Sequence, residues 1–320
     1  MDTRVRDLLE QRTFLTNAGT ETYLIFQQGF ELPEFCAFVV HEDDEAWESL
    51  QRNYLAPIFR AAAGSGCGLL LDALVWRAQP DFIAKLGRAP EELGPINERA
   101  VLRTRASVDR WRREHGRDAA SLPVLVVADI GPRGDGYRVD NLELTSDAAR
   151  QYHRPQIEAL AEARVDLVCA LTMTTAAESI GIAEAASACG LPTIVSPTVE
   201  TDGRLPDGTS LGSFVDSVDE ATGASPLFYM VNCAHPTHVL PTLEAARAKG
   251  EGWLARFRGF RSNASAQSHE ELDNSTELDR GEIQQLAERV AEMRTSYGLR
   301  VIGGCCGTDH EHLAALARSL

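Results

Sequence analysis

Three cysteines stand at positions where their thiols could bind one metal ion together. Cys233 ends the apolar run FYMVNCAHP, and the adjacent Cys305 and Cys306 end the run LRVIGGCCG. Three converging thiolates are the ligand set of a zinc site with a vacant fourth position. Neighbouring side chains of a straight strand point to opposite faces, so Cys305 and Cys306 can share a metal only if the backbone turns there. The flanking glycines of GGCCG permit such a turn.

The elements that would position these thiols are eight short apolar runs. They span residues 13–19, 68–76, 122–132, 165–174, 192–200, 228–236, 257–265 and 299–307. Segments with helical periodicity lie between them, as at 148–164, 178–189 and 281–298. This alternation predicts a parallel sheet covered by helices, and eight units in 320 residues fit a closed (β/α)8 TIM barrel of the α/β class. The barrel would set all three thiols around one mouth, because the carboxyl ends of its strands meet there.

An open, doubly wound sheet is the alternative architecture. Against it, the first strand and turn, LTNAGTETY, lack a Gly-x-Gly-x-x-Gly fingerprint, and GPRGDGY at 131–137 lacks the lysine and helix of a phosphate loop. No repeat or composition break marks a boundary, so we expect one barrel domain over residues 1–320. The polar stretch 263–282 is the longest predicted loop and would follow the seventh strand on the catalytic face.

Charge and cysteine usage exclude several classes of protein. The formal net charge of -16 argues against a nucleic-acid or anionic-membrane partner. The chain shows no signal-type segment and no apolar run of transmembrane length, which predicts a cytoplasmic protein. Seven scattered cysteines are unlike the dense, even framework of a small secreted domain, so most are expected to be reduced thiols.

Other residues have simpler interpretations. A lone cysteine in an apolar run is usually a small core side chain, which is what we expect of Cys36, Cys67, Cys169 and Cys189. The adjacent cysteines could instead form a vicinal disulfide, which a reducing cytosol disfavours, or a redox dithiol, which lacks the usual Cys-x-x-Cys spacing.

Histidine and tryptophan side chains also lie near the ends of these runs. His235 and His238 are alternative metal ligands, but Pro236 and the following helix would turn them away from the strand end. Trp76 is expected to pack in the barrel or to form a cavity wall. No nucleophile-elbow motif supports a Ser-His-Asp hydrolase.

The motifs VNCAHPTHV at 231–239 and VIGGCCGTDHEHL at 301–313 together resemble those of the homocysteine S-methyltransferase family. Supporting similarity runs along the chain, in LTNAGTETYLIFQQGFELP, GPRGDGY, YHRPQIEAL, GLPTIVSPTVETDGRLPDGTSL and RSNAS. The resemblance implies a (β/α)8 barrel and a zinc ion held by Cys233, Cys305 and Cys306. It also implies that homocysteine binds the zinc through its thiol, as the fourth ligand, and is methylated to methionine, with no catalytic residue needed beyond the metal centre.

Two positions depart from the family pattern, each by loss of a carboxylate. The family's first strand usually ends in Asp-Gly, and this chain has Asn17 there, followed by Ala18 and Gly19. The family's fourth strand commonly ends in a glutamate, and this chain has Leu171 at that position. A buried ammonium group is stabilised by a charged partner. We therefore expect this chain to recognise the acceptor differently from other members of the family. We expect Asn17 and Asp72 to contact the acceptor, and Glu21 and Glu178 are further candidate carboxylates.

The methyl donor is expected to be small and positively charged. Folate and cobalamin chemistry would need further domains, which leaves S-methylmethionine, S-adenosylmethionine or a betaine-like compound. Three alternatives remain for the function. The acceptor could be a different thiol or selenol, the barrel could bind zinc or thiols without catalysis, or the metal could serve a hydrolase. Three electron-rich thiolates disfavour the hydrolase, because hydrolases more often use histidine and carboxylates.

Overall fold

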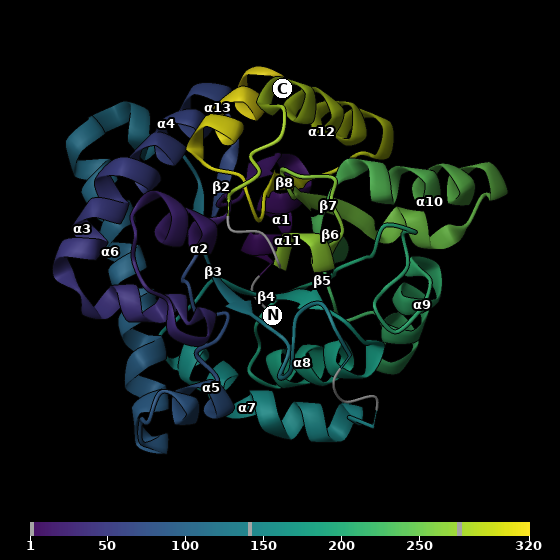
Figure 1. Ribbon diagram of the computed structural model, residues 1–320, viewed down its shortest axis with the longest axis horizontal. Helices are drawn as coiled ribbons and strands as arrows, with labels where there is room; N and C mark the ends of the chain where they lie inside the picture. The colour runs from purple at the N-terminus through teal and green to yellow at the C-terminus, as the bar shows by residue number, and fades with distance from the viewer. Residues whose placement is uncertain (1–2, 140–142, 274–276) are drawn as a thin grey trace.

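The protein is a closed barrel of eight parallel strands (Figure 1). The computed structural model describes residues 3–139, 143–273 and 277–320. The strands are β1 (Phe14–Leu15), β2 (Gly68–Asp72), β3 (Val124–Ile130), β4 (Leu167–Met173), β5 (Thr193–Pro197), β6 (Phe228–Ala234), β7 (Phe257–Ser262) and β8 (Val301–Gly304). The first strand pairs with both β2 and β8, which closes the sheet. The predicted TIM barrel is therefore confirmed, each strand lies within its predicted run, and the open-sheet alternative is wrong.

Helices surround the strands (Figure 1). The α-helices are α1 (Arg4–Gln11), α2 (Thr20–Thr22), α3 (Asp44–Leu50), α4 (Ala56–Ser65), α5 (Pro80–Lys85), α6 (Leu93–Ala120), α7 (Ser146–Glu162), α8 (Ala176–Ala188), α9 (Leu211–Thr222), α10 (Pro236–Lys249), α11 (His269–Asp273), α12 (Ile283–Tyr297) and α13 (His310–Arg318). Short π-helical and 3-10 turns add η1 (Tyr23–Gln27), η2 (Pro33–Phe35), η3 (Ala37–Glu42), η4 (Gln51–Leu55), η5 (Pro90–Glu92) and η6 (Gly252–Arg256). Among the described residues, no helix combines the length and the apolar character that crossing a membrane requires.

Local sequence explains where several helices begin and end. The hydroxyl of Thr145 accepts the Ala148 N–H at the start of α7, and the hydroxyl of Thr175 accepts the Glu178 N–H at the start of α8. These bonds satisfy amide groups that have no partner within the helix. Gly298 ends α12 with a φ of 65°, a conformation that favours glycine. The predicted helical segments at 148–164, 178–189 and 281–298 correspond to α7, α8 and α12.

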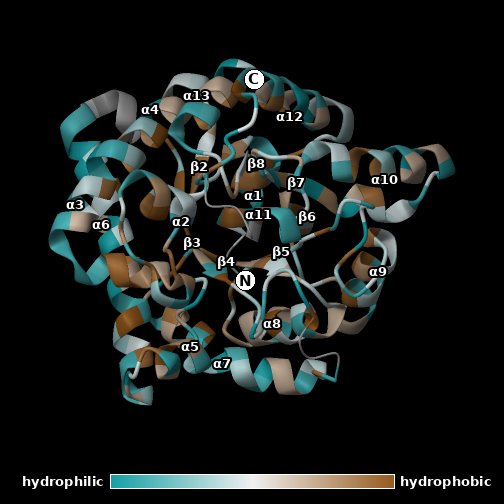
Figure 2. Cartoon of the chain, viewed as in Figure 1, coloured by the Kyte–Doolittle hydropathy of each residue, from teal (hydrophilic) through white to brown (hydrophobic). Residues whose placement is uncertain are grey.

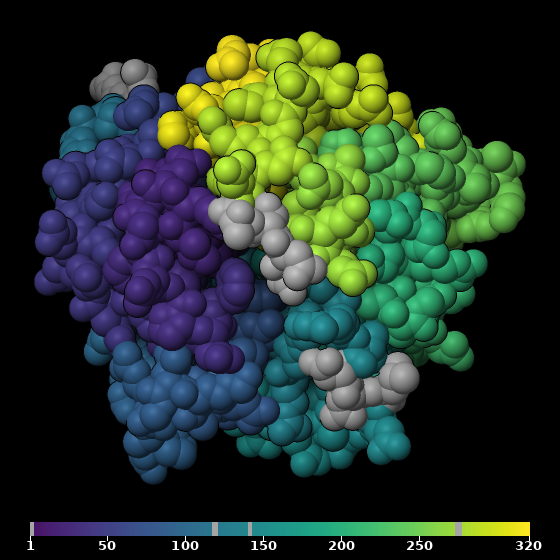
Figure 3. All heavy atoms as spheres, viewed as in Figure 1, coloured from purple at the N-terminus to yellow at the C-terminus, as the bar shows by residue number. Residues whose placement is uncertain are grey.

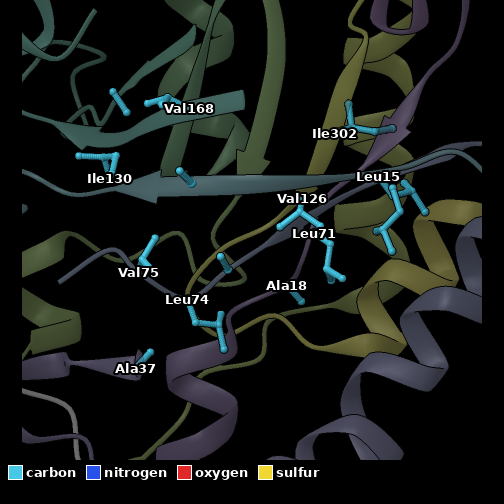
Figure 4. Close-up of a cluster of buried hydrophobic side chains, with 14 of the residues drawn as sticks. Leu15, Ala18, Ala37, Leu71, Leu74, Val75, Val126, Ile130, Val168 and Ile302 are labelled. Atoms are coloured by element: carbon cyan, nitrogen blue, oxygen red, sulfur yellow. The ribbon is translucent and has the colours of Figure 1, made fainter. Parts of the chain in front are cut away.

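Two apolar layers hold the barrel together. The larger one lies between the strands and the helices, where Figure 4 shows Leu71, Val126 and Ile302 among its side chains. The smaller one fills the barrel interior, and Val5 and Leu9 of α1 join it. Apolar colour accordingly gathers on the strands and on the helix faces that cover them (Figure 2). The tight interior leaves the carboxyl ends of the strands as the place where a site can form.

The barrel interior becomes polar toward the carboxyl ends of its strands. On β3 the inward residues run from Leu125 and Val127 to Asp129, at the spacing of two that places side chains on one face. On β2, Asp72 follows Leu70 in the same way. These carboxylates are only 3% (Asp129) and 6% (Asp72) exposed. The sequence thus builds a charged layer directly above the apolar interior.

The predicted polar loop at 263–282 does connect β7 to α12, and it contains the short helix α11. Residues 274–276 of that prediction lie outside the described residues. Cys36, Cys67 and Cys169 are buried as expected of small core residues, whereas Cys189 is half-buried at the end of α8.

Candidate metal centre and its cavity

The structure brings together the three cysteines that the sequence singled out. One sulfur from each of Cys233, Cys305 and Cys306 lies within 4.8 Å of the others. Cys233 and Cys305 are joined as a disulfide, and the sulfur of Cys306 lies 3.9 Å from that of Cys233. Within the described ranges, this is the one group of such ligands close enough to share a metal ion. The pair would have to be reduced before all three could act as thiolates.

An irregular strand end aims Cys233 at the site. The register between β6 and β7 shifts between Asn232 and Ala234, and Cys233 has a φ of 54°. Residues other than glycine rarely adopt this backbone conformation, and those that do cluster at functional sites. A bulge of this kind redirects one side chain without ending the strand. Cys233 therefore leaves the alternating pattern of β6 and faces the mouth.

The glycines around the cysteine pair serve two different purposes. Gly307 has a φ of 77° and makes the turn that follows Cys306. Gly304 is not in a left-handed conformation, but a Cβ there would collide with the hydroxyl of Thr308. The expectation that all three glycines supply unusual dihedral angles is therefore correct for Gly307, whereas Gly303 and Gly304 allow close packing.

Tyr137 lies over the thiols, a contact that the sequence did not reveal. Its hydroxyl oxygen is 3.6 Å from the sulfur of Cys233 and 3.6 Å from the sulfur of Cys306. Its ring packs against His269, with the centroids 4.4 Å apart. Burial raises the pKa of Tyr137 well above its usual value, so the hydroxyl stays protonated and can donate a hydrogen bond to a thiolate. The available signal was its place in GPRGDGY, directly after β3.

Hydrogen bonds from Arg77 and to Glu178 hold the loop that carries Tyr137. Arg77 donates from Nη1 to the carbonyl oxygens of Pro132 at 2.7 Å and Gly134 at 2.8 Å. Glu178 accepts the Arg133 N–H at 2.7 Å and contacts His153 at 2.9 Å. Glu178, a candidate acceptor contact from the sequence, therefore supports this loop instead.

A cavity of about 570 Å³ opens beside the thiols. Its wall combines strand ends with the loop of Tyr137, and it includes Trp76, Leu171 and the three cysteines. Figure 3 views this face of the molecule, whose surface is hollowed near the middle beside the N-terminal segment in purple. Its size suits a small-molecule ligand. The expectation that Trp76 forms a cavity wall is confirmed.

Comparison with known proteins decides the family. The family model described as Homocysteine S-methyltransferase matches residues 45–320. The chain belongs to the homocysteine S-methyltransferase family. The resemblance seen in the cysteine motifs is thus confirmed, and the chain is a member of a transferase family.

Two curated members of the homocysteine S-methyltransferase family are similar to the chain along most of its length. Homocysteine S-methyltransferase YbgG of Bacillus subtilis (strain 168) is 26% identical over 298 residues, which cover 89% of this chain and 87% of that protein. Homocysteine S-methyltransferase of Escherichia coli (strain K12) is 26% identical over 327 residues, which cover 98% of each.

Solved structures of the homocysteine methyltransferase MmuM from Escherichia coli have the same fold. The oxidized form aligns with a TM-score of 0.74 and 22% identity over 98% of each chain. The metallated form aligns with a TM-score of 0.73 and 21% identity, over 98% of this chain and 99% of that one.

The two departures from the homocysteine S-methyltransferase pattern occupy different places. Asn17 is 1% exposed, and its side-chain oxygen accepts the backbone N–H of Asp72 at 3.1 Å. Of the described residues that line the cavity, Asp72 is one and Asn17 is not. Leu171 does line it, and its carbonyl accepts the indole N–H of Trp76 at 3.3 Å. Asn17 therefore holds the end of β2, while Leu171 presents an apolar side chain to the ligand space.

Asp72 forms an ion pair at the floor of the cavity. Its carboxylate accepts a hydrogen bond from Nη2 of Arg261 at 2.7 Å, and both side chains are 6% exposed. Arg261 comes from β7, so the pair joins two separate strands of the barrel. A buried pair of this kind must keep both partners, because a lone buried charge is strongly destabilising.

The histidines near Cys233 lie outside the thiol group. His235 accepts the Thr237 N–H and begins α10, while His238 contacts the carbonyl oxygen of Ala266 at 3.0 Å. His269, which the sequence did not single out, contacts the carbonyl oxygen of Cys233 at 2.6 Å. The alternative of histidine ligands thus finds no support among the described residues.

Proposed function

We propose that the chain, as one barrel domain over residues 1–320, is a zinc-dependent S-methyltransferase that methylates the thiol of homocysteine to form methionine. The observation that carries the proposal is the convergence of the Cys233, Cys305 and Cys306 sulfurs beside the cavity of a family member. Both curated relatives are named homocysteine S-methyltransferases, and one similar structure is described as metallated.

The donor set suits zinc. Three cysteine sulfurs lie within 4.8 Å of one another, and the same residues line the cavity, so a ligand in the cavity could reach a bound metal. These three residues would hold the ion. Zinc bound there would keep an acceptor thiol, whose ordinary pKa is about 8.5, in its thiolate form at neutral pH.

Other residues would position the reactants. The Tyr137 hydroxyl donates toward the thiols, and such outer contacts orient metal ligands. Asp72 contacts the acceptor from the cavity floor, while Asn17 acts through the Asp72 backbone that it holds. The substrates are small molecules, and no nucleic acid or membrane is involved.

The chemistry needs little acid or base assistance. The acceptor sulfur forms a new bond to the methyl carbon, while the bond from that carbon to the positively charged sulfur or nitrogen of the donor breaks. The electron pair leaves with the donor, which departs neutral, and the acceptor thiol has already lost its proton. Suitable donors are S-methylmethionine, S-adenosylmethionine and betaine-like compounds.

A turnover assay tests the proposal. The reduced, zinc-loaded protein is incubated with homocysteine and each donor, and methionine is measured by mass spectrometry. We expect methionine with at least one donor, loss of activity in Cys306→Ser, and retention in Cys189→Ser, because Cys189 ends α8 and is not among the described residues that line the cavity. Absence of methionine with every donor would overturn the proposal, and methylation of another thiol or selenol alone would change the acceptor.

A further inference from the structure

The floor of the cavity carries more negative than positive charge. Glu21, Asp72 and Asp129 all line the cavity, and the guanidinium group of Arg261 lies among them. Asp72 is the carboxylate paired with Arg261, at 2.7 Å. Asp129 and Glu21 have no such partner among the ion pairs of the described residues. Two carboxylates therefore face the ligand space without an ion-pair contact of their own, although the charge of Arg261, which pairs with Asp72, reaches both.

Asp129 is the more buried of the two. It is 3% exposed, and one of its oxygens accepts the Val75 N–H at 3.1 Å. Among the described residues, this is the one hydrogen bond that another residue makes to its carboxylate. Burial, and then the charge of Asp72, raise the pKa of Asp129 well above its usual value. Such a group gains most from a cation that enters with the ligand.

Glu21 lines the same cavity as Asp129 and the three cysteines. It is half-buried at α2, and burial followed by the charge of Asp72 raises its pKa. Burial is the main cause of the raised pKa of Asp129, and the charge of Glu21 contributes to it. A small molecule with its sulfur at the thiols would thus share one cavity with these two carboxylates.

The floor carboxylates suit an organic cation better than a second metal ion. Within the described part of the chain, the three cysteines form the one group of potential ligands close enough to hold a metal. The floor carboxylates do not form such a group of metal ligands. The same cavity is also lined by the apolar side chains of Leu171 and Trp76, which suit a carbon chain. An organic cation with a thiol a few bonds away matches both halves of the cavity.

We propose that Asp129, assisted by Glu21, binds the α-ammonium group of the amino-acid acceptor. This inference rests on the proposed function, because it takes the acceptor to be an amino acid whose thiol lies at the cysteine cluster. It assigns recognition to β3 and α2, in place of the positions held by Asn17 and Leu171. Asp72, which is paired with Arg261, remains a further contact of the acceptor at the cavity floor.

The test compares ligands that differ only in the ammonium group. Homocysteine and 4-mercaptobutanoate are the acceptors in kinetic assays, and methionine and 4-(methylthio)butanoate are the ligands in calorimetric titrations of the full-length protein. Asp129→Asn and Glu21→Gln remove the charges while keeping the shape. Glu34→Gln removes a carboxylate at the rim, where it pairs with exposed Lys85, and is the matched control.

We expect wild type to prefer the ammonium-bearing ligand by about ten- to a hundredfold, the range for a hydrogen bond to a charged group. Asp129→Asn should reduce the preference to about threefold or less, Glu21→Gln should reduce it partly, and Glu34→Gln should leave it unchanged. The inference is overturned if Asp129→Asn keeps the full wild-type preference for the ammonium-bearing ligand. It is also overturned if Asp129→Asn raises the KM of the methyl donor and leaves that preference unchanged. If wild type methylates neither acceptor, the proposed function fails, and the methionine titrations still decide the inference.

Discussion

The hydroxyl oxygen of Tyr137 lies 3.6 Å from the sulfur of Cys306 and therefore links the loop after β3 to the cysteines after β8. Burial raises the pKa of the Cys306 thiol, and the hydrogen bond with Tyr137 acts in the opposite direction. The loop thus contributes to the electrostatics of a site whose sulfurs come from other strands.

Replacement Tyr137→Phe should weaken metal binding. The variant loses a donor to the thiols, and loss of such an outer contact typically lowers metal affinity or activity by about 10- to 100-fold. Zinc affinity is measured by competition with a chromogenic chelator. Tyr297→Phe, a change on α12, is the control and should bind zinc as wild type does. Equal affinity and equal turnover in Tyr137→Phe would show that the hydroxyl has no such role.

Replacement Cys306→Ser should remove most of the bound zinc while the barrel still folds. The thiols lie at the mouth, outside the two apolar layers that stabilise the fold. Metal content is measured by mass spectrometry and folding by circular dichroism, with Cys189→Ser as the matched variant. An unfolded Cys306→Ser protein at room temperature would mean that the metal is structural.

Much of this site could be predicted from the sequence, and the missing parts have physical causes. The alternation of apolar runs and helices was enough for the barrel, and a barrel is enough to bring the ends of β6 and β8 to one mouth. The left-handed conformation of Cys233 and the position of Tyr137 depend on contacts between distant segments. No local pattern encodes such contacts.

The contacts of Asn17 and Glu178 could not be predicted from the sequence either. Asn17 was a candidate because it stands where the family usually has an aspartate, and Glu178 because it is a carboxylate near a strand end. Their side chains instead bond to the backbone N–H groups of Asp72 and Arg133. Residue type alone does not distinguish a carboxylate or amide that binds a ligand from one that fixes a loop.

The Asp72–Arg261 pair should show strong coupling in a double-mutant cycle. Arg261→Met leaves a buried carboxylate without its partner, and breaking a buried pair in this way costs about 3–5 kcal/mol. The double variant Asp72→Asn with Arg261→Met should be less destabilised than the sum of the single variants. Urea denaturation of wild type, the two single variants and the double variant gives the four free energies of unfolding. Additive values would mean that the two side chains do not interact.

Addition of a carboxylate at the family's usual position should harm this protein. Leu171→Glu places a further negative charge in a cavity that Asp72 and Asp129 already line. We expect a loss of stability of about 1–3 kcal/mol, typical of a buried group without a partner, and no gain in homocysteine use. The double variant Leu171→Glu with Asp129→Asn should regain both the stability and the use of homocysteine. Improved turnover in Leu171→Glu alone would contradict the assigned role of Asp129.

His41 should make folding sensitive to acid. It is 1% exposed, and burial lowers its pKa from 6.5 to about 4, although a hydrogen bond with the carbonyl of Ala73 opposes the shift. Because the folded pKa lies below the unfolded one, its stabilising contribution is complete above pH 6.5 and is lost as the pH falls toward 4. A shift of this size corresponds to about 3 kcal/mol.

Denaturation curves between pH 7.5 and 4.5 test this contribution. The free energy of unfolding of wild type should fall more steeply with acidification than that of His41→Gln, which keeps a donor for Ala73 and cannot be protonated. Parallel curves for the two proteins would rule out a titrating role for His41.

The central claim, that the three cysteines present a metal to a thiol acceptor, is tested most directly by zinc-edge X-ray absorption of the reduced, zinc-loaded protein with and without homocysteine. The account predicts three sulfur ligands at about 2.3 Å in the free protein and a fourth sulfur when homocysteine is added. A nitrogen or oxygen ligand that persists in the presence of homocysteine, with no new zinc–sulfur contact, would contradict it.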